Sequence, residues 1–209
     1  PISVKLNSAD FQKGGFSAED SSKVAAMLSD AKIDLLEISG GTYEQPRLLG
    51  LDGVSINPKR SEARKESTIA REAYFLAYTE EIKKVIDIPL MVTGGFRSRA
   101  AMENAINEGA CEIIGIGRPL CSDPLSIKKL LDREIDVLPK FEKTLSIGPG
   151  WLSSSSPFRL IQAINAFGIQ SWFYSQIRRI SEGLDPDLSL NPLKAFREDG
   201  KIDKKTVQS

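Results

Sequence analysis

The sequence of 209 residues contains no histidine, and this absence excludes several kinds of chemistry. Imidazole is the side chain whose charge changes near neutral pH, and it is also a common metal ligand. Reactions that need an imidazole acid, base or ligand are therefore excluded from these residues. We assign no metal site from this sequence.

Charge of one sign and long apolar runs are missing as well. The 28 Lys and Arg residues balance 28 Asp and Glu residues, so the composition does not indicate a broad surface for nucleic acid. No apolar run is long enough to span a bilayer, and no signal peptide opens the chain. We expect neither nucleic acid nor a membrane as a partner. With 41% hydrophobic residues, the composition suits a soluble globular protein with a sizeable core.

Cysteine is scarce, since the chain contains two residues of this type, Cys111 and Cys121. They bracket an expected strand and lie near its opposite ends, too far apart for a disulfide. Free thiols fit a reducing compartment, so the expected localisation is cytoplasmic. We interpret both residues as small buried side chains rather than reactive thiols.

The stretch 89–124 contains two junctions between a strand and a glycine turn, one β/α unit apart. The strand at 90–93 ends in Gly94 and Gly95, and a second strand ends in a glycine turn that finishes with Arg118. Glycines let backbone N–H groups approach an anion, a helix N-terminus adds positive potential, and a guanidinium pairs with phosphate oxygens. Together these junctions predict a phosphate site, whereas either one alone is compatible with a plain tight turn.

Four strands, each followed by a helix, come from the hydrophobic pattern. The strands are expected at 2–6, 33–39, 90–93 and 112–116. The apolar run at 33–39 is typical of a strand covered on both faces. Strict alternation predicts a parallel sheet, either a small open sheet or half of an eight-stranded barrel. Ligands are then expected at the carboxyl ends of the strands.

Capping signals mark the expected helices. Ser17 begins a capping box, Ser98 caps the helix that Gly109 closes, and Asp123-Pro124 opens the next one. The first helix is expected to bury a face formed by Val24, Met27, Leu28 and Ala31. A long helix is expected over 61–86, after a turn-rich and functional loop at 40–60.

The alternation stops after residue 132. The composition of 138–156 is typical of a linker, and 160–182 predicts an amphipathic helix that Gly168 weakens. Its apolar face contains Ile164, Phe167, Trp172, Phe173 and Ile177. The tail from residue 183 is expected to be irregular or frayed. The predicted division is therefore a barrel-type part at 1–140 and a linker with a helical extension at 141–209.

Four segments together resemble a known family: VKLNSADF, LEISGGTYE, MVTGGFRS and IGIGRPLCSDP. They are similar to the C-terminal half of the Old Yellow Enzyme family of FMN-dependent NADH:flavin oxidoreductases, over about residues 2–125. The resemblance implies a TIM (β/α)8 barrel, of which this chain supplies the last four β/α units and a C-terminal helical tail.

The same resemblance implies a set of cofactor-binding residues. Lys5 matches the basic residue at the pyrimidine edge of the flavin, where positive charge stabilises the reduced ring. The other matches are to a loop beside the flavin and to two turns that bind its phosphate. These residues are Ser39, Gly40, Gly41, Gly94, Gly95, Phe96, Gly117 and Arg118.

The implied activity is hydride transfer from NAD(P)H through FMN to an enone-type or quinone-type acceptor. In the family, the pair that holds the substrate and the tyrosine that donates a proton come from the first half of the barrel. Tyr43 and Tyr74 do not match that tyrosine, so we assign no catalytic residue. Because the chain also begins at Pro1, we expect a fragment or processed product that forms a homo-oligomer or associates with the missing N-terminal half.

Other interpretations stay open at this point. The sequence is compatible with a phosphate-binding barrel that uses no flavin, or with a catalytically incompetent fragment that serves as an assembly module. Arg97 and Arg99 open a helix, where a nearby anion or exposure to water would each account for them. Glu37 lies in an apolar strand, and we expect it to form a structural ion pair rather than to act in catalysis.

Overall fold

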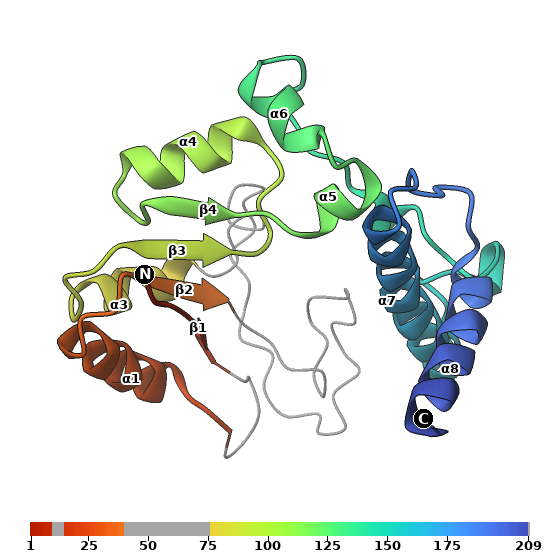
Figure 1. Cartoon of the computed structure of the whole chain (residues 1–209), viewed down its shortest axis with the longest axis horizontal. Helices are drawn as coiled ribbons and strands as arrows, with labels where there is room; N and C mark the ends of the chain where they lie inside the picture. The colour runs from red at the N-terminus through yellow and green to blue at the C-terminus, as the bar shows by residue number, and fades with distance from the viewer. Residues whose placement is uncertain (10–14, 40–75, 209) are drawn as a thin grey trace. The chain divides into compact units, whose positions relative to one another are not determined.

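The structure is a computed structural model that describes residues 1–9, 15–39 and 76–208 (Figure 1). The described residues form two compact units. The first unit contains the residues up to Gly117 together with Lys129–Leu138, and the second contains Arg118–Lys128 and 139–208. The predicted loop at 40–60, most of the helix at 61–86, and both Tyr43 and Tyr74 lie outside the described residues.

The first unit is built on one parallel sheet, as the alternation of strands and helices predicts. Its strands follow the sheet in chain order: β1 (Ser3–Asn7), β2 (Leu35–Ser39), β3 (Leu90–Thr93) and β4 (Ile113–Gly115). Each strand pairs with the next along the chain, so all four carboxyl ends lie along the same edge. This edge is where a parallel α/β sheet binds its ligands.

The two faces of the sheet differ in burial. On one face Leu36 and Ile38 of β2 are fully buried beside Leu90 and Val92 of β3. On the other face Glu37 is half-buried and Ile113 remains 42% exposed. The expectation that 33–39 is covered on both faces is therefore wrong. Leu36 and Ile38 point to one face of the sheet. Glu37, which lies between them in the sequence, points to the opposite face and stays in contact with water.

Helices α1 (Ala18–Asp30), α3 (Leu76–Lys83) and α4 (Arg99–Asn107) belong to the first unit. The capping box at Ser17 is confirmed, because its hydroxyl accepts a hydrogen bond from the Asp20 N–H while the Asp20 carboxylate accepts one from the Ser17 N–H. Ser98 caps α4 as predicted, and Gly109 follows its end with φ 71°.

The buried stripe of α1 differs from the predicted one. Met27 is 69% exposed, whereas the small residues Ser21, Ala25 and Ser29 are buried. Small side chains let the helix approach the sheet closely, and the Ser21 hydroxyl donates a hydrogen bond of 2.9 Å to the carbonyl of Asn7 in β1. Of the predicted face, Val24 and Leu28 are half-buried while Met27 and Ala31 are exposed, so hydrophobicity alone located the packed face only in part.

The second unit is helical, with α5 (Arg118–Ser122), α7 (Arg159–Ser181) and α8 (Pro192–Gln208). Helix α6 (Ser126–Leu131) spans the boundary, and it begins two residues later than the predicted start at Asp123-Pro124. The predicted linker contains two 3-10 turns, at Phe141–Lys143 and Gly150–Leu152. The expectation of an irregular tail is wrong, because the tail folds as α8 and packs along α7.

Gly168 lies where α7 meets the start of α8. A Cβ atom at this position would be 3.1 Å from the Pro192 carbonyl oxygen and 3.2 Å from the Pro192 Cβ atom. Glycine therefore allows close packing of the two helices, at the expense of local helix propensity. The same two helices are also joined by Asp199 of α8, which accepts a hydrogen bond from Ser171 and forms an ion pair with Arg178, both on α7.

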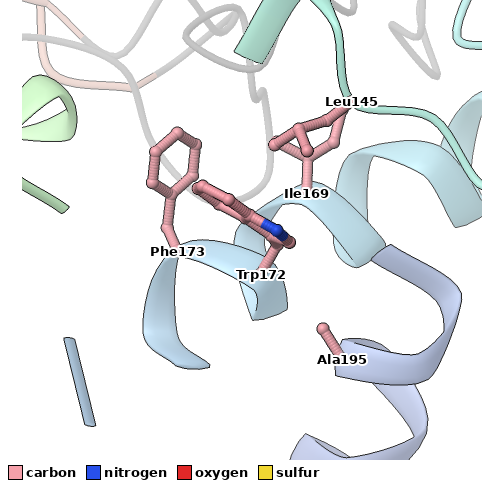
Figure 2. Close-up of a cluster of buried hydrophobic side chains, with 5 residues drawn as sticks. All are labelled: Leu145, Ile169, Trp172, Phe173 and Ala195. Atoms are coloured by element: carbon pink, nitrogen blue, oxygen red, sulfur yellow. The ribbon is translucent and has the colours of Figure 1, made fainter. Parts of the chain in front are cut away.

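The core of the second unit lies between α7, α8 and the segment before them (Figure 2). It contains Leu145, Ile169, Trp172, Phe173 and Ala195. The indole of Trp172 is fully buried and meets the Phe173 ring edge to face, with centroids 5.1 Å apart. Burial of these two rings is confirmed, but Phe167 and Ile177 of the predicted apolar face are 56% and 48% exposed.

Candidate functional site

The turn between β3 and α4 lies at the carboxyl edge of the sheet. Gly94 and Gly95 have φ values of 134° and 79°, which side chains with a Cβ atom rarely adopt. Phe96 follows with a fully buried ring, which anchors the turn against the core. Among the described residues, no acceptor is recorded for the N–H groups of Gly95 and Phe96. The turn thus offers backbone donors next to the start of α4, an arrangement that suits an anion.

The end of β4 is a second glycine position, and Gly115 is packed tightly there. A Cβ atom on Gly115 would lie 1.8 Å from Thr93 Oγ1 and 2.7 Å from Met91 Cε. Gly115 and Thr93 are register partners on neighbouring strands. The small residue therefore brings β4 beside β3 and sets the position of the chain that continues to Gly117.

Gly117 and Arg118 are placed differently from the prediction of a turn that ends in Arg118. Gly117 is exposed at the end of the first unit, and Arg118 is the first residue of α5 in the second unit. A Cβ atom on Gly117 would meet none of the described residues within 4 Å, so close packing against them does not require glycine there. The assignment of both residues to a phosphate stays a prediction.

Lys5 and Glu37 form an ion pair on the half-exposed face of the sheet. They are register partners on β1 and β2, and the Lys5 Nζ atom lies 2.6 Å from Glu37 Oε1. The Lys5 side chain is 56% exposed and that of Glu37 is 18% exposed. The predicted structural ion pair of Glu37 is confirmed. The assignment of Lys5 to the edge of a flavin stays a prediction, and Glu37 now has to be considered with it.

Ser39 ends β2 at the same edge of the sheet. Its carbonyl accepts a hydrogen bond of 2.6 Å from the N–H of Ser8, which ties the end of β2 to the residue after β1. The predicted partners of Ser39 in the flavin loop, Gly40 and Gly41, lie outside the described residues. Their assignment therefore also stays a prediction.

Exposure to water is the wrong interpretation for Arg97 and Arg99, whereas a nearby anion is confirmed for Arg99, which pairs with the Asp136 carboxylate. Arg97 is 7% exposed, and its Nη1 atom donates to the Phe96 carbonyl at 2.7 Å. Arg99 donates from Nη2 to the Ile135 carbonyl at 2.7 Å and pairs with Asp136 at 2.8 Å. These residues bind neighbouring protein groups rather than open water. Sequence reasoning missed Asp136 because it lies 37 positions from Arg99, with no local pattern that links them.

The two cysteines are free thiols, as predicted. Burial raises the pKa of Cys111 and of Cys121, so the thiolate form that reacts and binds metals is disfavoured. In the part of the chain that the structure describes, no group of three metal-binding side chains occurs. The described helices are also too short or too polar for any of them to cross a membrane.

The chain was compared with families and with individual known proteins. No family model matches it. It is 37% identical to the NADH-dependent flavin oxidoreductase iliE of Hypocrea jecorina, over 50% of this chain and 25% of that protein. It is 29% identical to the NADH oxidase of Thermoanaerobacter brockii, over 86% of this chain and 25% of that protein. The solved old yellow enzyme homologue from Zymomonas mobilis covers 67% of this chain and 34% of its own, with 18% identity and a TM-score of 0.43.

By its sequence matches, the chain is a homologue of flavin-dependent oxidoreductases. Its homologues are named NADH-dependent flavin oxidoreductase and NADH oxidase, which agrees with the resemblance, and a solved old yellow enzyme homologue covers part of the chain. The chain spans about a quarter of the length of the two curated relatives described above.

Proposed function

We propose that this chain is the FMN-binding half of an oxidoreductase with a (β/α)8 barrel. The sequential order of four parallel strands supports the barrel, because a doubly wound sheet reverses its strand order and this one does not. The kinship with NADH-dependent flavin oxidoreductases supports the class of reaction. A bound flavin would supply hydride transfer from NAD(P)H to an enone-type or quinone-type acceptor.

The turn after β3 is the observation that carries the proposal. Backbone N–H groups of Gly95 and Phe96 have no acceptor among the described residues, and Ser98, the N-cap of α4, lies two residues after Phe96. A phosphate group accepts hydrogen bonds from such donors and is favoured by the positive end of a helix. We assign the FMN phosphate to this turn. The sequence resemblance alone adds Gly117 and Arg118 as further phosphate-binding residues.

The half-exposed face of the sheet would then line the inside of the barrel. Lys5 lies on that face, and its ammonium would stabilise negative charge on the pyrimidine side of a reduced flavin. Glu37 holds the ammonium at 2.6 Å and reduces its net effect. The residues that hold the acceptor and donate a proton would come from an N-terminal half. The edges of β1 and β4 are suited to pair with that half, or with another copy of this chain.

The test of the proposal is the visible absorption spectrum of the chain after FMN is added and the excess removed. We expect a bound flavin spectrum, and Arg118→Ala should weaken FMN binding about tenfold or more, because a charge-assisted contact to the phosphate is lost. Arg159→Ala, which changes an exposed arginine of the second unit, is the control and should leave binding unchanged. A colourless chain, or equal FMN affinity in the Arg118 variant, would contradict the phosphate assignment.

Replacement of Lys5 tests the pyrimidine side separately. We expect Lys5→Met to lower the reduction potential of the bound flavin by about 20–30 mV, since about 30 mV corresponds to 1.4 kcal/mol for a two-electron couple. Glu37→Gln removes the opposing charge and should shift the potential upward. Potentiometric titration of the two variants measures both shifts. If the reduction potential of the bound flavin in both variants equals that in the wild-type chain, Lys5 does not belong to the cofactor site.

A further inference from the structure

Residues 134–138 belong to the first unit, follow α6 and run beside the start of α4. The N–H of Leu138 donates to the Arg97 carbonyl at 2.7 Å, and the N–H of Arg99 donates to the Asp136 carbonyl at 2.9 Å. Between them, Ser98 and Val137 form an antiparallel bridge. The segment is thus bound by backbone hydrogen bonds directly after the glycine turn.

The Arg99 side chain adds a second attachment. The Arg99 side chain is 16% exposed, and its guanidinium donates to the Ile135 carbonyl at 2.7 Å as well as to the Asp136 carboxylate. The Asp136 side chain is 88% exposed, so water screens its charge, and the ion pair contributes less to the attachment than the hydrogen bond to the Ile135 carbonyl does. The contact to the Ile135 carbonyl is therefore the stronger link between the helix start and the segment.

The turn needs support from outside, because two consecutive glycines allow many backbone conformations. On one side the buried ring of Phe96 fixes it to the core. On the other side Arg97 is buried, and Leu138, whose N–H binds the Arg97 carbonyl, is itself 1% exposed. The segment thus closes the side of the turn that faces α4 and leaves the Gly95 and Phe96 donors unused.

We propose that residues 134–138 form a strap that holds the β3–α4 turn in the shape that receives a phosphate group, with Arg99 as its positioning residue. The proposal rests on the FMN function proposed above and adds a residue to it. Donors that are already in place lose little freedom when the anion binds, which favours affinity. The strap should consequently affect recognition of the phosphate and not of the flavin ring.

The test compares wild-type chain with Arg99→Met by hydrogen–deuterium exchange and by titration with FMN and riboflavin, which lacks the phosphate. We expect exchange at residues 95–98 to rise and FMN affinity to fall about tenfold, as small misplacements of binding groups commonly cost one to two orders of magnitude. Riboflavin affinity should stay the same. Arg99→Lys should restore part of the FMN affinity, and Asp136→Asn should have a smaller effect than Arg99→Met.

The control is Lys83→Met, which breaks an ion pair at the opposite end of the sheet. Lys83 binds Glu112, whose other oxygen accepts from the Leu90 N–H at the start of β3. This variant should lower stability without a change in exchange at 95–98. Equal loss of FMN and riboflavin, or unchanged exchange in Arg99→Met, would overturn the strap. If the wild-type chain binds no FMN, the proposed function fails. The exchange at residues 95–98 in Arg99→Met then tests by itself whether residues 134–138 hold the turn.

Discussion

Gly115→Ala is expected to destabilise the first unit by about 2 kcal/mol or more, because overpacking at a tight site costs about 1–3 kcal/mol and this site is extreme. The new Cβ atom would lie 1.8 Å from Thr93 Oγ1 and 2.8 Å from Thr93 Cβ. Both distances are shorter than real contacts allow, so β4 has to move away from β3. Loss of that pairing would also displace the turn after β3.

Urea denaturation monitored by circular dichroism measures this effect, with Gly117→Ala as the matched control. Gly117 lies two residues further on, and a Cβ atom there would meet none of the described residues within 4 Å, so its replacement should change stability by less than about 0.5 kcal/mol. Thr93→Ala should rescue Gly115→Ala in part, since it removes Oγ1, which is buried and has no hydrogen-bond partner among the described residues. Equal stability of Gly115→Ala and Gly117→Ala would refute the tight contact between the strands.

Trp172→Ala is expected to cost about 3–5 kcal/mol, the usual range for removal of a large buried aromatic ring. The indole is fully buried and stacks with Phe141, with ring centroids 6.2 Å apart. It also meets the Phe173 ring edge to face (Figure 2). No other side chain of the second unit's core is as large. The variant should therefore lose the packing of α7 and α8, with a fall in helical circular dichroism.

Phe167→Ala is the control for this second prediction, because it removes an aromatic ring from the same helix. Phe167 is 56% exposed and contacts Phe196 with ring centroids 6.4 Å apart. Its loss should cost about 1 kcal/mol or less, since much of the ring is already in water. If both variants had the same midpoint of denaturation, Trp172 would not be the centre of the core.

Much of the first unit could be predicted because its signals are local. The strand at 90–93 has the predicted bounds, and the caps at Ser17 and Ser98 are present. Helix α8 was missed because its mean composition is polar, and its stability depends on contacts with α7 that local sequence does not contain. Met27 was placed inside for the converse reason: it is hydrophobic, but the packed side of α1 needs small residues.

In the candidate site, too, features with a local sequence pattern could be predicted, and features that depend on distant residues could not. Gly94 and Gly95 could be recognised because a strand followed by two glycines is a local pattern with a backbone consequence. The neighbours of Arg97 and Arg99 could not be recognised, since they come from 134–138. The pairing of Lys5 with Glu37 needed the register of two strands, which sequence separation of 32 residues does not reveal.

The order of the strands also bears on how the first unit assembles. Each strand pairs with the one synthesised before it, so contacts within the sheet are formed between successive β/α units. Such a sheet can grow from its N-terminal end during translation. The turn between β3 and α4 is different, because Leu138 supplies one of its hydrogen bonds and is synthesised about forty residues later. The turn at the carboxyl edge of the sheet is consequently the last part of this unit to reach its final structure.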